Sequence, residues 1–127
     1  MTFHYTVQTA KNFDQAVEAV TQETAKIGMR VLHIHNVQET LDSKGFQIEP
    51  LKIVEVCSAK HANTLLQKDK KMALFMPCKI NVYVDDGKVW ISAMDTSPIA
   101  QINPNLNFSD LAEEVNQNLR AIVDKAK

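Results

Sequence analysis

The chain has 127 residues, of which 45% are hydrophobic and 23% charged, with a net charge of −1. This length suits a single domain, and we treat residues 1–127 as one. A nearly neutral chain has no basic field for nucleic acid or an anionic membrane, so we expect neither partner. The N-terminus lacks a signal-peptide pattern and no apolar stretch reaches the ~18 residues of a membrane span, so we expect a cytoplasmic protein with reduced thiols.

The first part of the chain predicts a strand, a helix and a second strand. Apolar and polar residues alternate over residues 3–7, as in a strand with one buried face. Asn12, with Gln15 three residues later, forms a capping-box pattern that begins a helix. Apolar residues then recur at helical spacing until Gly28, which suits a helix end. Residues 30–37 alternate again and are rich in β-branched side chains, which predicts a strand.

Residues 38–50 are less regular. We expect a short helical turn at Leu41, a turn at Gly45 and an irregular strand that ends at Ile48. Glycine and proline in this segment interrupt any long periodic pattern, so neither a long helix nor a long strand is predicted here.

The clearest local signal is a β-hairpin over residues 78–94. It follows a strand over residues 52–57 and a short helix that Ser58 begins as N-cap. Asp86-Gly87 lies between two alternating runs, and such a pair favours a two-residue primed turn. The turn fixes the register, and it pairs Val84 with Val89, Val82 with Ile91 and Ile80 with Ala93.

The C-terminal part predicts a loop and a long helix. Residues 95–107 contain two prolines and are interpreted as a loop, whereas residues 109–126 form an amphipathic helix whose charges complement the helix dipole. Two long amphipathic helices require a sheet face that they can cover. We therefore predict an α+β two-layer sandwich, a mostly antiparallel sheet with two long helices on one face and one short helix.

Strand alternation divides the predicted sheet into a core face and an uncovered face. On residues 30–37 we place Leu32 and Ile34 in the core and both histidines on the uncovered face. That face then combines His33, His35, Glu55, Cys57, Asn81, Tyr83, Trp90 and Met94. Such a mixture suits a dimer interface or a ligand cleft, and a plain solvated face is the third interpretation.

The two cysteines are the best chemical lead. Cys57 precedes the short helix, whose unpaired N–H groups would favour a thiolate and lower the thiol pKa. His61 lies four residues on, and with His33 or His35 it could complete a soft-metal site. An inert buried cysteine is the alternative. Cys78 has core-side parity, so we predict a packed thiol that does not form a disulfide with Cys57.

Three runs of the chain resemble a known family. They are Leu41-x-x-Lys44-Gly45-Phe46, Ile53-Val54-Glu55-Val56-Cys57-x-x-x-x-Ala62 and Leu74-Phe75-Met76-Pro77-Cys78-Lys79-Ile80-x-Val82-Tyr83. They resemble the family called "domain of unknown function 302", in which Asn-Pro usually follows the first cysteine, where this chain has Ser58 and Ala59. The resemblance implies a TATA-binding-protein-like α+β fold and a small, cytoplasmic, dimeric protein. It implies no established activity and no catalytic residues.

The leading hypothesis is a dimeric ligand- or partner-binding accessory module. Its candidate binding residues are His33, His35, Cys57, His61, Cys78, Tyr83 and Trp90. The expected partners are a second copy of the chain and a small ligand. The alternative is a thiol-dependent redox or soft-metal-binding protein centred on Cys57. No Ser-His-Asp arrangement or phosphate-binding loop is recognisable, so we name no catalytic residue, and the sequence identifies neither a metal nor a cofactor.

Overall fold

The computed structural model describes residues 2–127, within which five strands form one antiparallel sheet. The strands are β1 (His4–Thr9), β2 (Arg30–Asn36), β3 (Leu51–Cys57), β4 (Cys78–Asp85) and β5 (Lys88–Met94), in the spatial order β1-β5-β4-β3-β2. The helices are α1 (Phe13–Lys26), α2 (Val37–Asp42), α3 (Ala59–Lys68), α4 (Ser97–Ile102) and α5 (Ser109–Ala126), with 3-10 helices η1 (Lys70–Phe75) and η2 (Pro104–Leu106).

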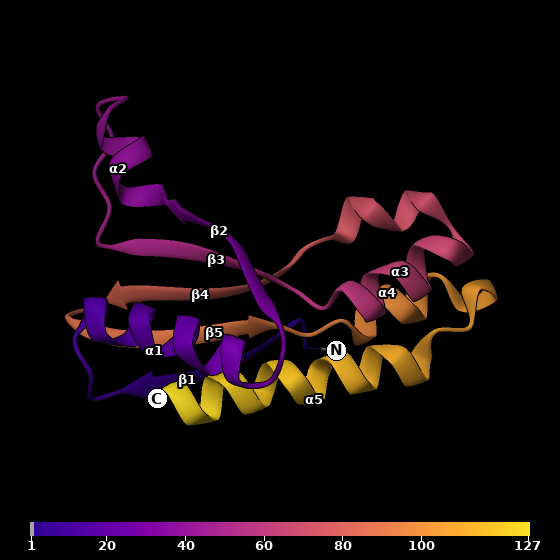
Figure 1. Ribbon diagram of the computed structural model, residues 1–127. Helices are drawn as coiled ribbons and strands as arrows, with labels where there is room; N and C mark the ends of the chain where they lie inside the picture. The colour runs from indigo at the N-terminus through magenta and orange to yellow at the C-terminus, as the bar shows by residue number, and fades with distance from the viewer. Residues whose placement is uncertain (1) are drawn as a thin grey trace.

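The two long helices α1 and α5 lie side by side and pack against the sheet (Figure 1). The main core lies between them and the sheet, and its fully buried members include Val20, Val54, Val56, Ile80, Val82, Ile91, Leu119 and Ile122. The predicted α+β two-layer sandwich is therefore confirmed. No helix among the described residues is both long and apolar enough to cross a membrane.

The hairpin between β4 and β5 has the predicted turn. Asp86 and Gly87 both have positive φ, at 53° and 74°, as a two-residue primed turn requires. Glycine tolerates this conformation at no steric cost, and aspartate tolerates it better than most residues. The observed register pairs Val84 with Val89, Val82 with Ile91 and Ile80 with Ala93, as predicted.

The start of α1 also follows the prediction. The Asn12 side chain accepts a hydrogen bond from the Gln15 backbone N–H at 2.8 Å, and the Gln15 side chain accepts one from the Asn12 backbone N–H at 3.1 Å. This reciprocal capping box satisfies two backbone donors that the helix itself leaves free. The helix therefore begins where the sequence predicts.

A bulge in β2 changes which side chains enter the core. Val31 and His33 pair with consecutive residues of β3, so Leu32 is an extra residue in the strand. Leu32 is 53% exposed, and its predicted place in the core was wrong. Val31 packs against the core instead, together with Ile34, whose prediction was correct. Beyond the bulge the alternation resumes, so His33 and His35 keep their predicted face.

The segment around α2 projects from one end of the sheet (Figure 1). The helical turn predicted at Leu41 is α2, and it ends in a Schellman motif. The Phe46 N–H donates to the Leu41 carbonyl and the Gly45 N–H to the Asp42 carbonyl, both at 3.0 Å, with Gly45 at a φ of +85°. The predicted strand ending at Ile48 is absent, because residues 46–48 join no ladder.

Residues 95–107, predicted as a loop, contain two helical segments. Pro98 lies in the first turn of α4, and Pro104 begins η2. A proline in the first turn of a helix costs nothing, because the N–H that it lacks would have no partner there. The same prolines that suggested a loop therefore mark the starts of helices.

Candidate functional site

The structure separates the predicted binding residues into two groups. On the uncovered face of the sheet lie His33, His35, Tyr83 and Trp90. A cavity at one end of the sheet is lined by Cys57, His61 and Cys78. By register Cys57 lies on the same face as Glu55, the partner of His33, and it also reaches the cavity at the end of β3.

The cavity lies where β3 ends and β4 begins, at the end of the molecule where α3 and α4 gather beside α5 (Figure 1). The chain leaves the sheet at Ser58, which is the N-cap of α3 as predicted, although its side chain makes no capping bond. It returns through η1 and Pro77 to β4. This excursion, together with α4 and the first half of α5, encloses a space that the main core does not fill.

The cavity has a volume of about 80 Å³ and a largely apolar lining. Its apolar walls include Leu65, Met72, Phe75, Met76, Phe108 and Val115. Met72 and Phe108 are buried and, with Ala100 and Ala112, form a second hydrophobic cluster apart from the main core. Since a cavity of 150 Å³ can hold benzene, this one admits roughly three or four non-hydrogen atoms.

Both thiols line this cavity, although alternation along the strands places their side chains on opposite faces of the sheet. Cys57 pairs with Arg30 and Cys78 with Val56, so their side chains leave the sheet on opposite faces, as predicted. The cavity is formed at the ends of the strands and reaches both. Each cysteine is a free thiol in the structure.

Burial keeps these thiols protonated. Desolvation raises the pKa of Cys57. The pKa of Cys78 is raised to about 11, mainly by desolvation and then by repulsion from a Cys57 thiolate. The positive charge of Lys79 lowers it by a smaller amount. The direction is opposite to the predicted lowering of the Cys57 pKa at the start of α3, and its cause is desolvation by burial.

His61 places a directed polar group at the cavity. Its Nε2 lies 3.2 Å from Oε1 of Glu114 on α5. A carboxylate only accepts hydrogen bonds, so Nε2 carries a proton, and in the neutral form of the imidazole this is the single ring proton. In that form Nδ1 is a bare acceptor, and it is buried without a hydrogen-bond partner among residues 2–127.

The predicted soft-metal cluster is not assembled. His33 and His35 lie on the uncovered face and do not line the cavity that Cys57 and His61 share. Over residues 2–127 no three His, Cys, Asp or Glu side chains are placed together so that they could hold a metal ion. The cavity thus offers an apolar space with two neutral thiols and one imidazole.

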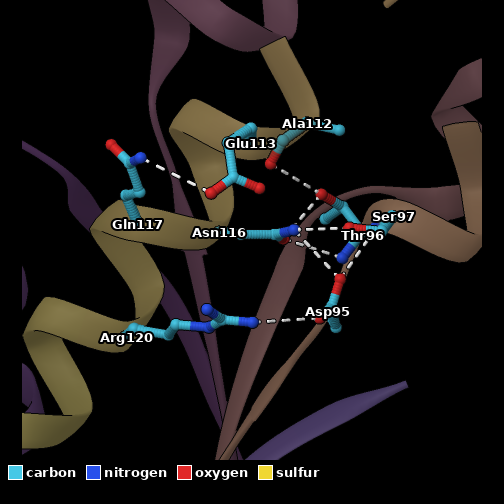
Figure 2. Close-up of polar contacts among 8 residues, drawn as sticks. All are labelled: Asp95, Thr96, Ser97, Ala112, Glu113, Asn116, Gln117 and Arg120. Carbon is cyan, nitrogen blue, oxygen red and sulfur yellow. Dashed lines mark hydrogen bonds and ion pairs between the residues drawn. The ribbon is translucent and has the colours of Figure 1, made fainter. Parts of the chain in front are cut away.

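A buried polar network, missed by the sequence prediction, holds α4 against α5 (Figure 2). Asn116 is only 2% exposed, yet all of its polar atoms are satisfied. Its Oδ1 accepts from the backbone N–H of Thr96 at 2.8 Å and from the Thr96 hydroxyl at 2.7 Å. Its Nδ2 donates to Asp95 and to the Ser97 hydroxyl, both at 2.9 Å. Because Thr96 lines the cavity, this network fixes one of its walls.

Asp95 completes the network at its edge. It accepts a hydrogen bond from the Ser97 backbone N–H at 2.9 Å, and Arg120 lies 3.4 Å away (Figure 2). Burial alone would raise the pKa of Asp95, but the bonds from Ser97 and the charge of Arg120 outweigh it, and the pKa lies below its usual value. The sequence signal for this network was an asparagine, Asn116, within the apolar face of α5.

The uncovered face consists of rows that run across the strands. Cross-strand pairing defines the first row, which contains Leu51, Tyr83, Trp90 and Gln8. The next is His35, Ile53, Asn81, Ser92 and Thr6. A third contains His33, Glu55 and Lys79. The face is thus apolar and aromatic along one row and charged along another.

Two contacts give the histidines of this face a fixed arrangement. The rings of His33 and His35 meet edge to face at 4.3 Å between centroids. His35 Nε2 also lies 3.2 Å from Oε2 of Glu55. In the middle row, the Oδ1 atom of Asn81 is buried and has no hydrogen-bond partner. Among the described residues, the face therefore carries a histidine–carboxylate contact and one buried side-chain acceptor without a partner.

Comparison with known proteins supports the predicted family. Residues 5–126 match the family described as "Domain of unknown function DUF302". The crystal structure of an uncharacterized conserved protein DUF302 from Bacillus stearothermophilus is similar, with a TM-score of 0.92 and 27% sequence identity over 100% of both chains. None of the curated proteins matches this chain. A family match over nearly the whole length shows that the chain belongs to the DUF302 family.

Proposed function

We propose that this protein is a binding module that takes a small, mostly apolar ligand into the cavity beside Cys57, His61 and Cys78. The observation that carries the proposal is the cavity itself, about 80 Å³ of space with a largely apolar lining. Protein interiors are close-packed, and voids larger than a water molecule are few in a domain. Concave apolar sites with a few polar groups are the usual form of ligand sites.

The state of the thiols favours binding over thiol chemistry. A thiol with a pKa of about 11, as Cys78 has, is thiolate in only about one molecule in ten thousand at pH 7. The pKa of Cys57 is also raised. The thiolate is the nucleophile and the metal ligand, so neither cysteine is activated for redox exchange. In the proposed function both side chains act as soft apolar surface.

Xenon, a small apolar atom, is a suitable probe of the cavity. Xenon should shift the backbone amide resonances of residues that line the cavity, such as Leu65 and Val115, in a two-dimensional NMR spectrum. Ala62→Leu should abolish these shifts, because Ala62 lines the cavity and the larger side chain would fill it. The matched control is Ala59→Leu on the exposed side of the same helix, which should leave the shifts unchanged. Xenon shifts that persist in Ala62→Leu, or are absent from the wild type, would refute the proposal.

For the uncovered face we propose a homodimer. Helices α1 and α5 cover the opposite face, while Tyr83 and Trp90 lie in an apolar row that no helix covers (Figure 1). The charged row carries Glu55 and Lys79 side by side, so a two-fold axis could set opposite charges against each other. A second copy could also supply the donor that Asn81 Oδ1 lacks. Trp90→Glu tests this proposal and is described in the Discussion.

A further inference from the structure

We propose that the ligand of the cavity donates a hydrogen bond to Nδ1 of His61, which makes small neutral alcohols the preferred class. This inference rests on the proposed function, since it requires that the cavity binds a ligand. It adds the polar group that the ligand must carry and the atom of the protein that recognises it.

The contact with Glu114 sets the tautomer of the neutral His61 ring. Glu114 Oε1, at 3.2 Å, fixes the ring proton on Nε2. The same bond sets the orientation of the ring, in the way that a carboxylate orients a histidine in many functional sites. In this neutral tautomer Nδ1 has a lone pair and no proton, so it can accept a hydrogen bond but cannot donate one.

The Nδ1 atom of His61 lies in a buried environment. The His61 side chain is 13% exposed, and its Nδ1 atom is buried with no partner among the described residues. Nearly all buried polar atoms in folded proteins have a hydrogen-bond partner, and a bare buried acceptor is unfavourable. His61 also lines the cavity. A ligand with an O–H group in this cavity could satisfy this buried side-chain acceptor.

The cavity suits an uncharged ligand. The walls near His61 are apolar, and the two thiols are protonated at neutral pH. An ionised ligand would lose its hydration here without gaining a counter-charge, which is very costly. A ligand with acceptors only would set its lone pairs against that of Nδ1. The chemistry therefore selects a neutral molecule with a hydroxyl group and an apolar body of about three carbon atoms, which the volume of about 80 Å³ admits.

The test compares two probes of equal size, propan-1-ol and 1-fluoropropane, of which only the alcohol has a donor. Their dissociation constants are measured by NMR titration on the wild type and on His61→Leu. The ratio of the constant for propan-1-ol to that for 1-fluoropropane should rise about tenfold in His61→Leu, since one hydrogen bond is lost. Taking the ratio removes the different hydration of the two probes and any general change in the cavity.

His4→Leu is the matched control, because it removes an exposed imidazole that does not line the cavity and should leave the ratio unchanged. An unchanged ratio in His61→Leu would overturn the inference while the proposed function stands. If neither probe binds the wild type, the proposed function fails and the inference with it.

A second measurement on the wild type does not depend on the folding of a variant. Long-range proton–nitrogen NMR spectra should show His61 as the Nε2–H tautomer. Propan-1-ol should then move the Nδ1 resonance toward that of a hydrogen-bonded acceptor, and 1-fluoropropane should not. A proton found on Nδ1 in the free protein, or a resonance that does not respond to the alcohol, would overturn the inference.

Discussion

The two hydrophobic clusters of this protein differ in how they are built. The main core joins regular strands to α1 and α5, and its central side chains, such as Val82 and Ile91, are fully buried. The second cluster, around Met72 and Phe108, joins short helices, a 3-10 helix and the start of α5, and it encloses the cavity. Regular elements pack closely through their periodicity, whereas short segments joined by turns can leave space between them. The main core thus supplies stability, and the second cluster supplies the candidate site.

The largest expected effect is in the main core. Val82→Asp should destabilise the protein by more than about 4 kcal/mol, because it leaves an unpaired charge at a position with no solvent exposure. The control is Asn81→Asp, on the next residue and the half-buried opposite face, where the carboxylate keeps part of its hydration. Thermal melts of both variants provide the measurement. Similar losses in the two would contradict the assignment of faces.

The second prediction concerns the network that holds the wall of the cavity. Asn116→Ala should cost about 2–3 kcal/mol, because it removes four hydrogen bonds and leaves buried partners such as the Thr96 N–H unsatisfied. Gln117→Ala is the matched control one residue on, since that exposed side chain contacts only Glu113, at 3.4 Å (Figure 2). Urea unfolding measures the loss, and hydrogen exchange should show α4 opening before the main core. Equal stability of the two variants would show that the network is dispensable.

The sequence predicted the main core well because its signals are local. The hairpin register follows from Asp86 and Gly87, and the start of α1 follows from the Asn12 capping box. The bulge at Leu32 could not be predicted, because no residue type in β2 marks the extra position. It depends on how the strand pairs with β3, which is a property of the whole sheet.

The cavity was predicted only in part, for physical reasons. The spacing of Cys57 and His61 indicated that the two could lie near each other, and both line the cavity. The walls from α4 were missed, because Pro98 suggested a loop although it begins a helix. The raised pKa of Cys57 was missed as well, since the burial that causes it comes from segments distant in the sequence. Sites built by short irregular segments are therefore less predictable than the core that supports them.

The third prediction concerns the uncovered face of the sheet, which lies outside both hydrophobic clusters. Wild-type protein should be a dimer by light scattering, and Trp90→Glu should be a folded monomer, with the dimer weakened by about 2 kcal/mol or more. The reason is that Trp90 lies beside Tyr83 in the apolar row, where a charge would oppose association. Gln22→Glu, at an exposed position of α1 on the opposite side of the sheet, is the control and should remain dimeric. A wild type that stays monomeric at high concentration would contradict the proposal.

The smallest expected effect is a pH dependence that distinguishes the second cluster from the main core. The pKa of Asp95 lies below its usual value in the folded protein, so its ionised form stabilises the fold. That contribution is fully present above the unfolded-state pKa of about 3.9 and is lost as the pH falls through the lower, folded pKa. Asp95→Asn should therefore show a shallower loss of unfolding free energy than the wild type between about pH 4 and pH 2. Because the buried hydrophobic residues of the main core do not titrate, hydrogen exchange over this range should increase first in α4, and a uniform increase across the sheet would contradict the link to Asp95.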